Sequence, residues 1–274
     1  MMMKAAIYIG KKGVESDDRI ASLFSELEAG GCTLHFLADG ERPSPDSDIL
    51  LSVGGDGTFL SSSTLVAGSD IPVLGVNAGR LGFLSENRPE DIAKALLGGD
   101  FRIESRAMLM ADVVTGSPSI DSWPYALNEI TVHRSGAAML GVDVSIDGIQ
   151  LPTYWADGLV ISTSSGSTAY SLSVGGPIVL PESRVLIISP IAPHNLNIRP
   201  LVVPDTAEIL LEMHSRDRRF ILTADNRTAE VSEETKVRIA VAQFSLKRVR
   251  LNRTNFINAL TEKLFWGEDI RNIK

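Results

Sequence analysis

The residues with the clearest chemical potential are three glycines around one carboxylate, in the segment Gly-Gly-Asp-Gly-Thr at residues 54–58. Glycine carries a conformational cost, so this density of glycine indicates that the backbone itself is used. Without side chains, backbone N–H groups approach phosphate oxygens closely, and a helix starting here would add its positive end. The pattern predicts a phosphate-binding loop, although a tight turn with an Asp helix cap would use the same residues.

The carboxylate, Asp56, separates this loop from the two common phosphate motifs. Neither the Gly-Lys-Ser/Thr of a P-loop nor the Gly-x-Gly-x-x-Gly of a dinucleotide fold is present here. A carboxylate beside phosphates is repulsive unless it binds a metal or accepts a proton. Asp56 is therefore a candidate for either role.

Two polar segments further along the chain suit nucleotide recognition. In Asn128-Glu129, the amide can read an adenine edge and the carboxylate can accept hydrogen bonds from ribose hydroxyls, although an ordinary surface strand is the commoner explanation. The segment 156–177 is rich in glycine and hydroxyl side chains that suit ribose and phosphate, but a flexible Ser/Gly loop has the same composition. For His194 we favour a structural role, since no Cys or second His lies at metal-ligand spacing.

The elements that must position these residues change character near residue 101. Before it, apolar runs at 4–9, 33–37, 49–53 and 72–76 alternate with helical patterns, which predicts βαβ units and a mainly parallel sheet. The helical patterns are those around Ile20, Leu23, Phe24 and Leu27, from the glycine loop to Leu65, and from Pro89 to Leu97.

After residue 101 the alternation is that of strands. Ile130 and Val132 share one face, and the run ending at Ile146 leads into an Asp147-Gly148 turn. We expect an α/β domain (Rossmann-like, residues 1–100), a β-sandwich domain (101–252) and a tail helix (253–274) that packs back on the first domain. A ligand is expected in the cleft between the domains.

The composition limits the class of protein. Hydrophobic residues make up 44% of the 274 residues and charged residues 22%, as in soluble globular proteins. The formal net charge of -8 argues against nucleic-acid binding. The apolar run Ala5 to Ile9 is too short for a signal sequence or membrane span. The single cysteine, Cys32, fits a reducing compartment, so we expect a cytoplasmic protein without membrane attachment.

Five segments, in one order from Ser52 to about Arg227, resemble the NAD kinase family. The loop 54–58 resembles the one shared by NAD kinases, diacylglycerol and sphingosine kinases and, more distantly, 6-phosphofructokinases. Family-specific similarity lies in the other segments: Asn-Ala-Gly-Arg-Leu-Gly-Phe-Leu at 77–84, Asn128-Glu129 before a β-branched run, the string 156–177, and the proline-rich segment 189–201.

This resemblance implies the family fold and the family reaction, transfer of the γ-phosphate of ATP to the 2′-hydroxyl of the adenosine ribose of NAD. Asp56 would orient or deprotonate that hydroxyl while a divalent cation, Mg²⁺, bridges the donor phosphates. The residues implied to bind ATP or NAD are Gly54, Gly55, Asp56, Gly57, Thr58, Asn77, Asn128, Glu129, Trp155, Asp157, Ser165, Thr168, Ala169, Tyr170, Ser171, Leu172, Ser173 and Ala192. The family also implies a homodimer or homotetramer.

Some positions depart from the family pattern. Ser164 replaces a proline and Ser165 a threonine, Trp155 stands where a basic residue is common, and Asn226-Arg227 replaces Gly-Gln. Two rival functions remain: a lipid kinase should lack Asn128-Glu129 and the 166–170 string, and a non-catalytic NAD sensor would have no need of Asp56.

Overall fold

The computed structural model describes residues 2–11, 13–79, 82–115 and 124–264. The chain divides into two compact units. Unit 1 comprises residues 1–105 and 246–274, and unit 2 comprises residues 106–245. The sequence-based boundaries at residues 100 and 252 therefore differ from this division by five and seven residues, because two long strands each contribute to both units.

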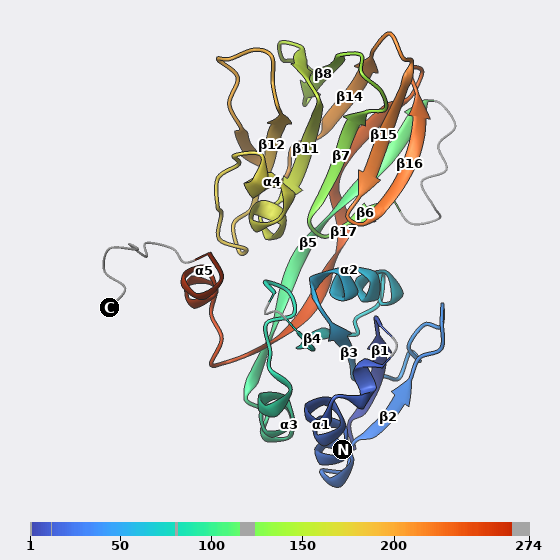
Figure 1. Ribbon diagram of the computed structural model, residues 1–274, viewed down its shortest axis with the longest axis vertical. Helices are drawn as coiled ribbons and strands as arrows, with labels where there is room; N and C mark the ends of the chain where they lie inside the picture. The colour runs from blue at the N-terminus through green and yellow to red at the C-terminus, as the bar shows by residue number, and fades with distance from the viewer. Residues whose placement is uncertain (1, 12, 80–81, 116–123, 265–274) are drawn as a thin grey trace. The chain divides into compact units, whose positions relative to one another are not determined.

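Unit 1 contains a parallel sheet in the order β2-β1-β3-β4 (Figure 1). The strands are β1 (Lys4–Ile9), β2 (Thr33–Phe36), β3 (Ile49–Gly54) and β4 (Val73–Asn77). The helices are α1 (Asp18–Ala29), α2 (Asp56–Leu65) and α3 (Pro89–Gly98), with a short 3₁₀ turn η1 (Val14–Ser16) before α1. Each of these strands and helices lies where the hydrophobic periodicity predicts it.

Helices α1 and α3 cover one face of this sheet. Their apolar stripes share one core with alternate residues of the strands, including Ile7, Leu51 and Val76. Phe59 of α2 is fully buried but lies outside that core. Since side chains alternate across a strand, the intervening residues, such as Leu50 and Ser52, face the side opposite α1 and α3.

Unit 2 consists of antiparallel strands in two sheets. One sheet has the order β13-β12-β11-β7-β15-β16, and the second contains β10-β8-β14-β17 together with β5, β6 and β9. The first set has the bounds β7 (Glu129–Arg134), β11 (Gly158–Thr163), β12 (Val185–Ile191), β13 (Leu201–Pro204), β15 (Arg219–Ala224) and β16 (Arg227–Ser232). The second set has the bounds β5 (Phe101–Thr115), β6 (Tyr125–Ala126), β8 (Leu140–Ile146), β9 (Ile149–Gln150), β10 (Tyr154–Ala156), β14 (Ile209–His214) and β17 (Lys236–Leu251).

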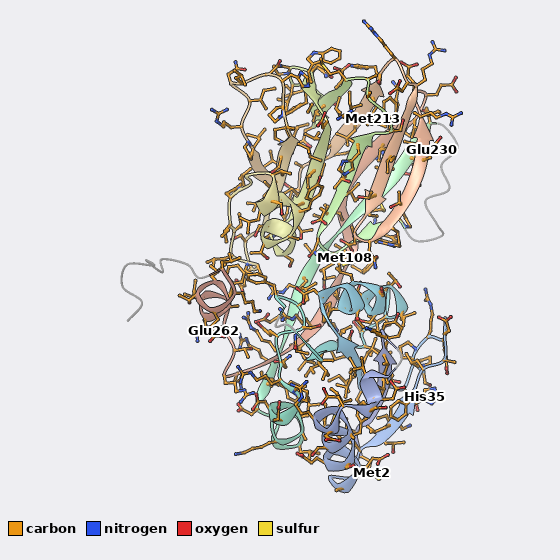
Figure 2. The ribbon with its side chains drawn as sticks, viewed as in Figure 1. Met2, His35, Met108, Met213, Glu230 and Glu262 are labelled. Carbon is orange, nitrogen blue, oxygen red and sulfur yellow. The ribbon has the colours of Figure 1, made fainter. Side chains whose placement is uncertain are left out.

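A single apolar core fills unit 2. It draws Val132 from β7 and Ile161 from β11 in one sheet, and Val144 from β8 and Leu211 from β14 in the other. Met213 of β14 belongs to this core (Figure 2). The predicted fold class, an α/β domain followed by an all-β sandwich, is confirmed. The predicted Asp147-Gly148 turn is also confirmed, since both residues have positive φ, 50° and 79°.

The C-terminal part of the chain belongs to unit 1. Strand β17 pairs with β14 through residues 236–239 in unit 2, and its Arg248 pairs with Val73 of β4 in unit 1. Helix α5 (Phe256–Leu264) follows, and the ring of Phe256 lies 6.3 Å from that of Phe83. Residues 265–274 of the predicted tail lie outside the described residues. In the described part of the chain, no helix combines the length and apolar character that crossing a bilayer requires.

Candidate functional site

The glycine loop lies at the point where the strand order of the parallel sheet reverses. Strand β1 has β2 on one side and β3 on the other, so the connections leave in opposite directions at the ends of β1 and β3. In open α/β sheets this switch point is where ligands bind. The N–H of Gly10, just after β1, donates to the carbonyl of Val53, which brings the two strand ends together beside residues 54–58.

Two glycines, Gly10 after β1 and Gly54 in the loop, provide close packing, and the other two glycines of the loop provide free space. A Cβ at Gly10 or at Gly54 would lie 2.2 Å from the hydroxyl oxygen of Thr58, so the Thr58 side chain fills the space beside both. A Cβ at Gly55 or Gly57 would meet nothing within 4 Å. The backbone at these two positions, at the start of α2, is therefore open to an anion.

Asp56 is held by a different segment of unit 1. Its Oδ2 accepts the N–H of Phe83 at 2.8 Å, and its Oδ1 accepts the N–H groups of Leu84 at 3.0 Å and Ser85 at 2.8 Å. The alternative that Asp56 caps its own helix is wrong, because the cap position is Gly55 and no side chain caps α2. A Cβ at Gly82 would lie 1.9 Å from Oδ1 of Asp56, so only glycine allows this approach.

Asn77 shapes the same loop. Its Oδ1 accepts the N–H of Gly79 at 2.9 Å and its Nδ2 donates to the carbonyl of Ser85 at 3.0 Å. The side chain is 5% exposed. It thus joins the two limbs of the 77–85 loop, of which residues 80–81 are outside the described residues.

Sequence reasoning missed a set of buried charges behind this loop. The guanidinium of Arg248 lies 2.8 Å from Glu86, and that of Arg250 lies 3.2 Å from the same carboxylate. All three side chains are at most 5% exposed. The alternation of Arg248 and Arg250 with Val249 and Leu251 could have indicated them, since charges at alternate positions of an apolar strand require buried partners.

A lysine from α5 also reaches the loop. The Nζ of Lys263 donates to the carbonyl of Gly82 and lies 4.6 Å from the centroid of the Phe83 ring. Burial lowers the pKa of Lys263 to about 8, against the opposing effect of Glu86 and Asp56. The 54–58 loop has no lysine of its own. The lysine beside the 82–85 loop, Lys263, instead comes from a segment about 200 residues away in the sequence.

Among the described residues, no cluster of three or more His, Cys, Asp or Glu side chains is arranged to hold a metal ion. Asp56 stands between the two open glycines of the loop in the sequence. This donor set fits Mg²⁺ brought with a nucleotide, because Mg²⁺ in such sites uses one or two carboxylates and fills its shell with phosphates and water.

In unit 2, Asn128 and Glu129 lie at the start of β7, and their backbone is fixed by Asp225. This carboxylate accepts the N–H groups of Leu127 and Asn128, both at 2.8 Å, and of Glu129 at 3.3 Å. Burial raises the pKa of Glu129 to about 8, and the Asp225 charge adds to the shift. The Oε2 of Glu129 is buried without a hydrogen-bond partner. An unpartnered buried oxygen is unfavourable, so a ligand hydroxyl would relieve it.

The hydroxyl-rich segment is ordered and packs against Asn128. After β11 it forms the 3₁₀ turn η2 (Ser165–Thr168) and the short helix α4 (Tyr170–Ser173). A Cβ at Gly166 would lie 2.1 Å from the carbonyl oxygen of Asn128, so glycine permits the contact. Several hydroxyls are used internally: Ser164 donates to Pro181, Ser167 to Val179, and Ser171 lies 3.3 Å from Ser189. The flexible-loop alternative is therefore wrong.

Tyr170 connects this segment to β7. Its ring stacks on that of His133 with a centroid distance of 5.7 Å. Its backbone N–H faces the Glu129 carboxylate. The group formed by Asn128, Glu129 and residues 165–173 is thus one continuous surface of unit 2.

Trp155, Asp157 and Ala192 lie elsewhere in unit 2. Asp157 pairs with Arg134 at 2.7 Å, at the far end of β7 from Glu129. Five residue-to-residue steps along the strand separate these ends, roughly 16 Å. Ala192, just after β12, has a φ of 45°. The structure therefore does not bring these three residues to Asn128 and Glu129.

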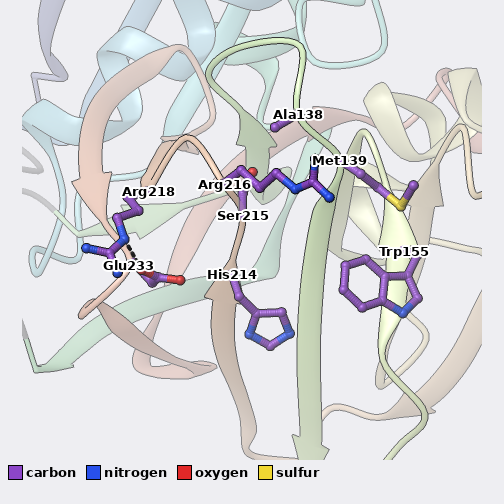
Figure 3. Close-up of a pocket in the computed structure, with 8 residues that line it drawn as sticks. All are labelled: Ala138, Met139, Trp155, His214, Ser215, Arg216, Arg218 and Glu233. Atoms are coloured by element: carbon purple, nitrogen blue, oxygen red, sulfur yellow. Dashed lines mark ion pairs between the residues drawn. The ribbon is translucent and has the colours of Figure 1, made fainter.

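Trp155 lines a separate surface cavity of about 760 Å³ (Figure 3). Its ring lies 5.9 Å from that of His214, and Arg218 pairs with Glu233 at 3.1 Å on the opposite side. The remaining lining residues are Ala138, Met139, Ser215 and Arg216. None of these is among the other predicted site residues.

Arg227, which departs from the family pattern, has a structural role. Its guanidinium donates to the carbonyl of Tyr125 and, at 3.2 Å, to that of Ala224. It therefore secures the β15–β16 turn that carries Asp225.

Comparison with known proteins gives one consistent result. Residues 41–98 match the model of the ATP-NAD kinase N-terminal domain, and residues 127–251 match that of the ATP-NAD kinase C-terminal domain. The chain is 40% identical to the NAD kinase of Flavobacterium psychrophilum, covering 93% of this chain and 88% of the relative. It is 44% identical to the NAD kinase of Porphyromonas gingivalis, covering 98% of this chain and all of the relative.

Solved structures of NAD and NADH kinases are also similar to this chain. The crystal structure of an NAD kinase from Archaeoglobus fulgidus in complex with ATP has a TM-score of 0.75 and 29% identity, covering 95% of this chain and 98% of that one. Yeast NADH kinase complexed with NADH has a TM-score of 0.85 at 22% identity, covering 100% of this chain and 90% of that one, and shows the shared fold.

Proposed function

The chain belongs to the NAD kinase family, and from this we propose that it transfers the γ-phosphate of ATP to the 2′-hydroxyl of the adenosine ribose of NAD, giving NADP. It is a phosphotransferase with nucleotides as both substrates. The relatives that bear this name cover nearly its whole length.

One observation carries the proposal: the Asp56 carboxylate, fixed by three backbone N–H groups, adjoins two glycines with open space at their Cβ positions. An ionised carboxylate has about four lone-pair sites, so three N–H bonds leave one for a ligand hydroxyl. In this role Asp56 accepts a hydrogen bond, or the proton, from the attacking ribose hydroxyl. Holding that hydroxyl in line with the γ-phosphate supplies the orientation that phosphoryl transfer needs.

The open backbone at Gly55 and Gly57, flanked by Gly54 and Thr58, receives the phosphates of ATP, with the positive end of α2 behind it. Mg²⁺, held by donor phosphates with Asp56 in reach, would neutralise charge on the transferring group. Asn77 contributes by fixing the backbone of the 77–85 loop.

For NAD, we propose that Asn128 and Glu129 bind the adenosine, with Glu129 using its unpartnered Oε2. The adjoining residues Ser165, Thr168, Ala169, Tyr170, Ser171, Leu172 and Ser173 complete this surface. Buried Ser171 acts by packing, since its hydroxyl faces Ser189. We also propose that NAD contacts Trp155, Asp157 and Ala192, at a greater distance from Asn128 and Glu129.

We further propose a cytoplasmic homo-oligomer that binds neither nucleic acid nor membrane. The net charge of -8 and the single, buried Cys32 support the location and the absence of nucleic-acid binding. The homo-oligomer rests on the family.

The separation of roles is tested by two alanine variants. Asp56→Ala should lower kcat by roughly 10² or more with little change in the KM for NAD, since Asp56 serves the chemical step. Asn128→Ala should mainly raise that KM. Alanine is preferred to asparagine at position 56, because an Asn amide would point an NH₂ donor at a backbone N–H. A normal kcat for a folded Asp56→Ala protein would exclude Asp56 from the reaction.

A further inference from the structure

Asp56 and two cations of the C-terminal segment lie on opposite sides of the same short loop, residues 82–85. The three peptide groups of this loop each make one hydrogen bond to Asp56 and one to a cation. The peptide joining Gly82 to Phe83 has its carbonyl on Lys263 and its N–H on Asp56. All groups involved belong to unit 1.

The next two peptides repeat the pattern with Arg248. Its Nη2 donates to the carbonyl of Phe83 at 3.2 Å and to that of Leu84 at 3.1 Å. The N–H groups of the same peptides, those of Leu84 and Ser85, donate to Oδ1 of Asp56 at 3.0 and 2.8 Å. Each peptide dipole thus has its negative end on a cation and its positive end on the carboxylate.

From this geometry we infer that Arg248 and Lys263 are positioning residues for Asp56, acting through the 82–85 peptides. Each peptide carries a dipole of about 3.5 D, and hydrogen bonds arranged in series polarise one another. The cations therefore fix the orientation of the loop and strengthen the hydrogen bonds from its N–H groups that hold the Asp56 carboxylate. The inference rests on the proposed role of Asp56 and extends it to a segment remote in sequence.

Burial makes this arrangement rigid. Arg248 is 4% exposed, it is also fixed by Glu86 at 2.8 Å, and its guanidinium carbon lies 6.0 Å from the centroid of the Phe59 ring on α2. The same helix starts at Asp56. One nitrogen, Nη2 of Arg248, makes the contacts to both carbonyls and to the carboxylate of Glu86, so a single buried centre joins the loop to this ion pair.

The test uses two variants and two matched controls. Arg248→Met is compared with Lys247→Met, the neighbouring residue of β17, which pairs with the exposed Asp70. Lys263→Met is compared with Glu262→Met, an exposed neighbour on α5 (Figure 2). Lys263 is half-buried at the end of α5, so its variant keeps the test decisive if Arg248→Met fails to fold.

Both variants should lower kcat at least about tenfold, because small displacements of a reacting group are costly, while the KM values for ATP and NAD change less than about threefold. Lys263→Arg should restore most of the loss, and both controls should keep the parent kcat. In an Asp56→Ala background, the same substitutions should change kcat less than about twofold, since the group they position is gone.

A parent-like kcat in Lys263→Met and in a folded Arg248→Met would overturn the inference. So would an equal loss with and without Asp56, which would show that the cations act by another route. The proposed role of Asp56 fails separately, if Asp56→Ala itself keeps the parent kcat, and the proposed function fails if the parent protein makes no NADP.

Discussion

At the scale of single residues, the proposed chemistry depends on two carboxyl groups with different surroundings. Asp56 accepts three backbone N–H bonds, whereas Glu129 has a buried oxygen without a partner. The first is held as a fixed acceptor. The second is a carboxyl whose hydrogen bonding is incomplete until a ligand arrives.

Glu129 gives a pH-dependent prediction. Its pKa rises from 4.5 to about 8 in the folded protein, first because of burial and then because of Asp225. Between these values the folded protein binds a proton that the unfolded chain has released. The free energy of unfolding therefore falls as the pH rises through this window.

Glu129→Gln removes the carboxyl group, so the free energy of unfolding of the variant should lack this fall with rising pH. The difference in melting temperature, variant minus parent, should therefore increase from pH 5 to pH 8. Thermal melts of the ligand-free proteins measure it. Glu230→Gln is the control, because Glu230 lies exposed on β16 in a surface pair with Arg219 (Figure 2). A constant difference between Glu129→Gln and the parent across the range would contradict the assignment.

Sequence patterns predicted some of these residues and missed others, for a physical reason. The glycine loop and Asn128-Glu129 are local strings, so spacing alone reveals them. The groups that position Asp56 and Glu129 are not local: Arg248 contacts the 82–85 loop, and Asp225 contacts the backbone of Glu129, from distant parts of the sequence. In addition, the helix-cap interpretation of Asp56 was wrong because its acceptors are used by a loop 27 to 29 residues away.

At the scale of elements, the site depends on close approaches that only glycine allows. The η2 turn contacts the end of β7 at Gly166, whose Cβ would lie 2.1 Å from the backbone carbonyl of Asn128. Backbone cannot yield as a flexible side chain can. The turn and Asn128 would have to separate.

Gly166→Ala should therefore raise the KM for NAD at least about tenfold, equivalent to a loss of roughly 1.4 kcal/mol of binding, with a smaller effect on kcat. Initial rates at varied NAD concentration measure this. Gly98→Ala is the control, because a Cβ there meets nothing within 4 Å at the end of α3. An unchanged KM in Gly166→Ala would mean that η2 does not position Asn128.

Elements were predicted well where local periodicity is strong. Strands β1 to β4 and helices α1 to α3 have regular apolar spacing, and most of the helix ends are marked by glycine or proline. The course of β17 was not predicted, because the hydrophobic pattern of a strand does not change where the strand passes from one unit to the other. The second boundary between the units, at residues 245 and 246, reflects the pairing of the end of β17 with β4.

At the scale of the whole molecule, charge sets a requirement. A chain with a net charge of -8 must bind two polyanionic nucleotides, and no lysine lies in the phosphate loop itself. Lys263 is already engaged by the carbonyl of Gly82. Neutralisation of the donor phosphates should therefore depend on a divalent cation.

Initial rates should fall to background in excess EDTA and return when Mg²⁺ is added beyond the chelator. Binding of NAD alone, followed by calorimetry in EDTA, should persist, because the Asn128-Glu129 surface contains no metal ligand cluster among the described residues. Full turnover in excess chelator would remove the metal from the mechanism.

The central claim is the transfer of a phosphoryl group from ATP to the 2′-hydroxyl of NAD, and one assay tests it most directly. Purified protein is incubated with ATP, Mg²⁺ and NAD, and the product is read with a dehydrogenase specific for NADP. We expect NADP to accumulate with time and enzyme concentration, and no product from an NAD analogue that lacks the adenosine 2′-hydroxyl. Absence of NADP, with phosphorylation of a diacylglycerol or a long-chain base instead, would contradict the account.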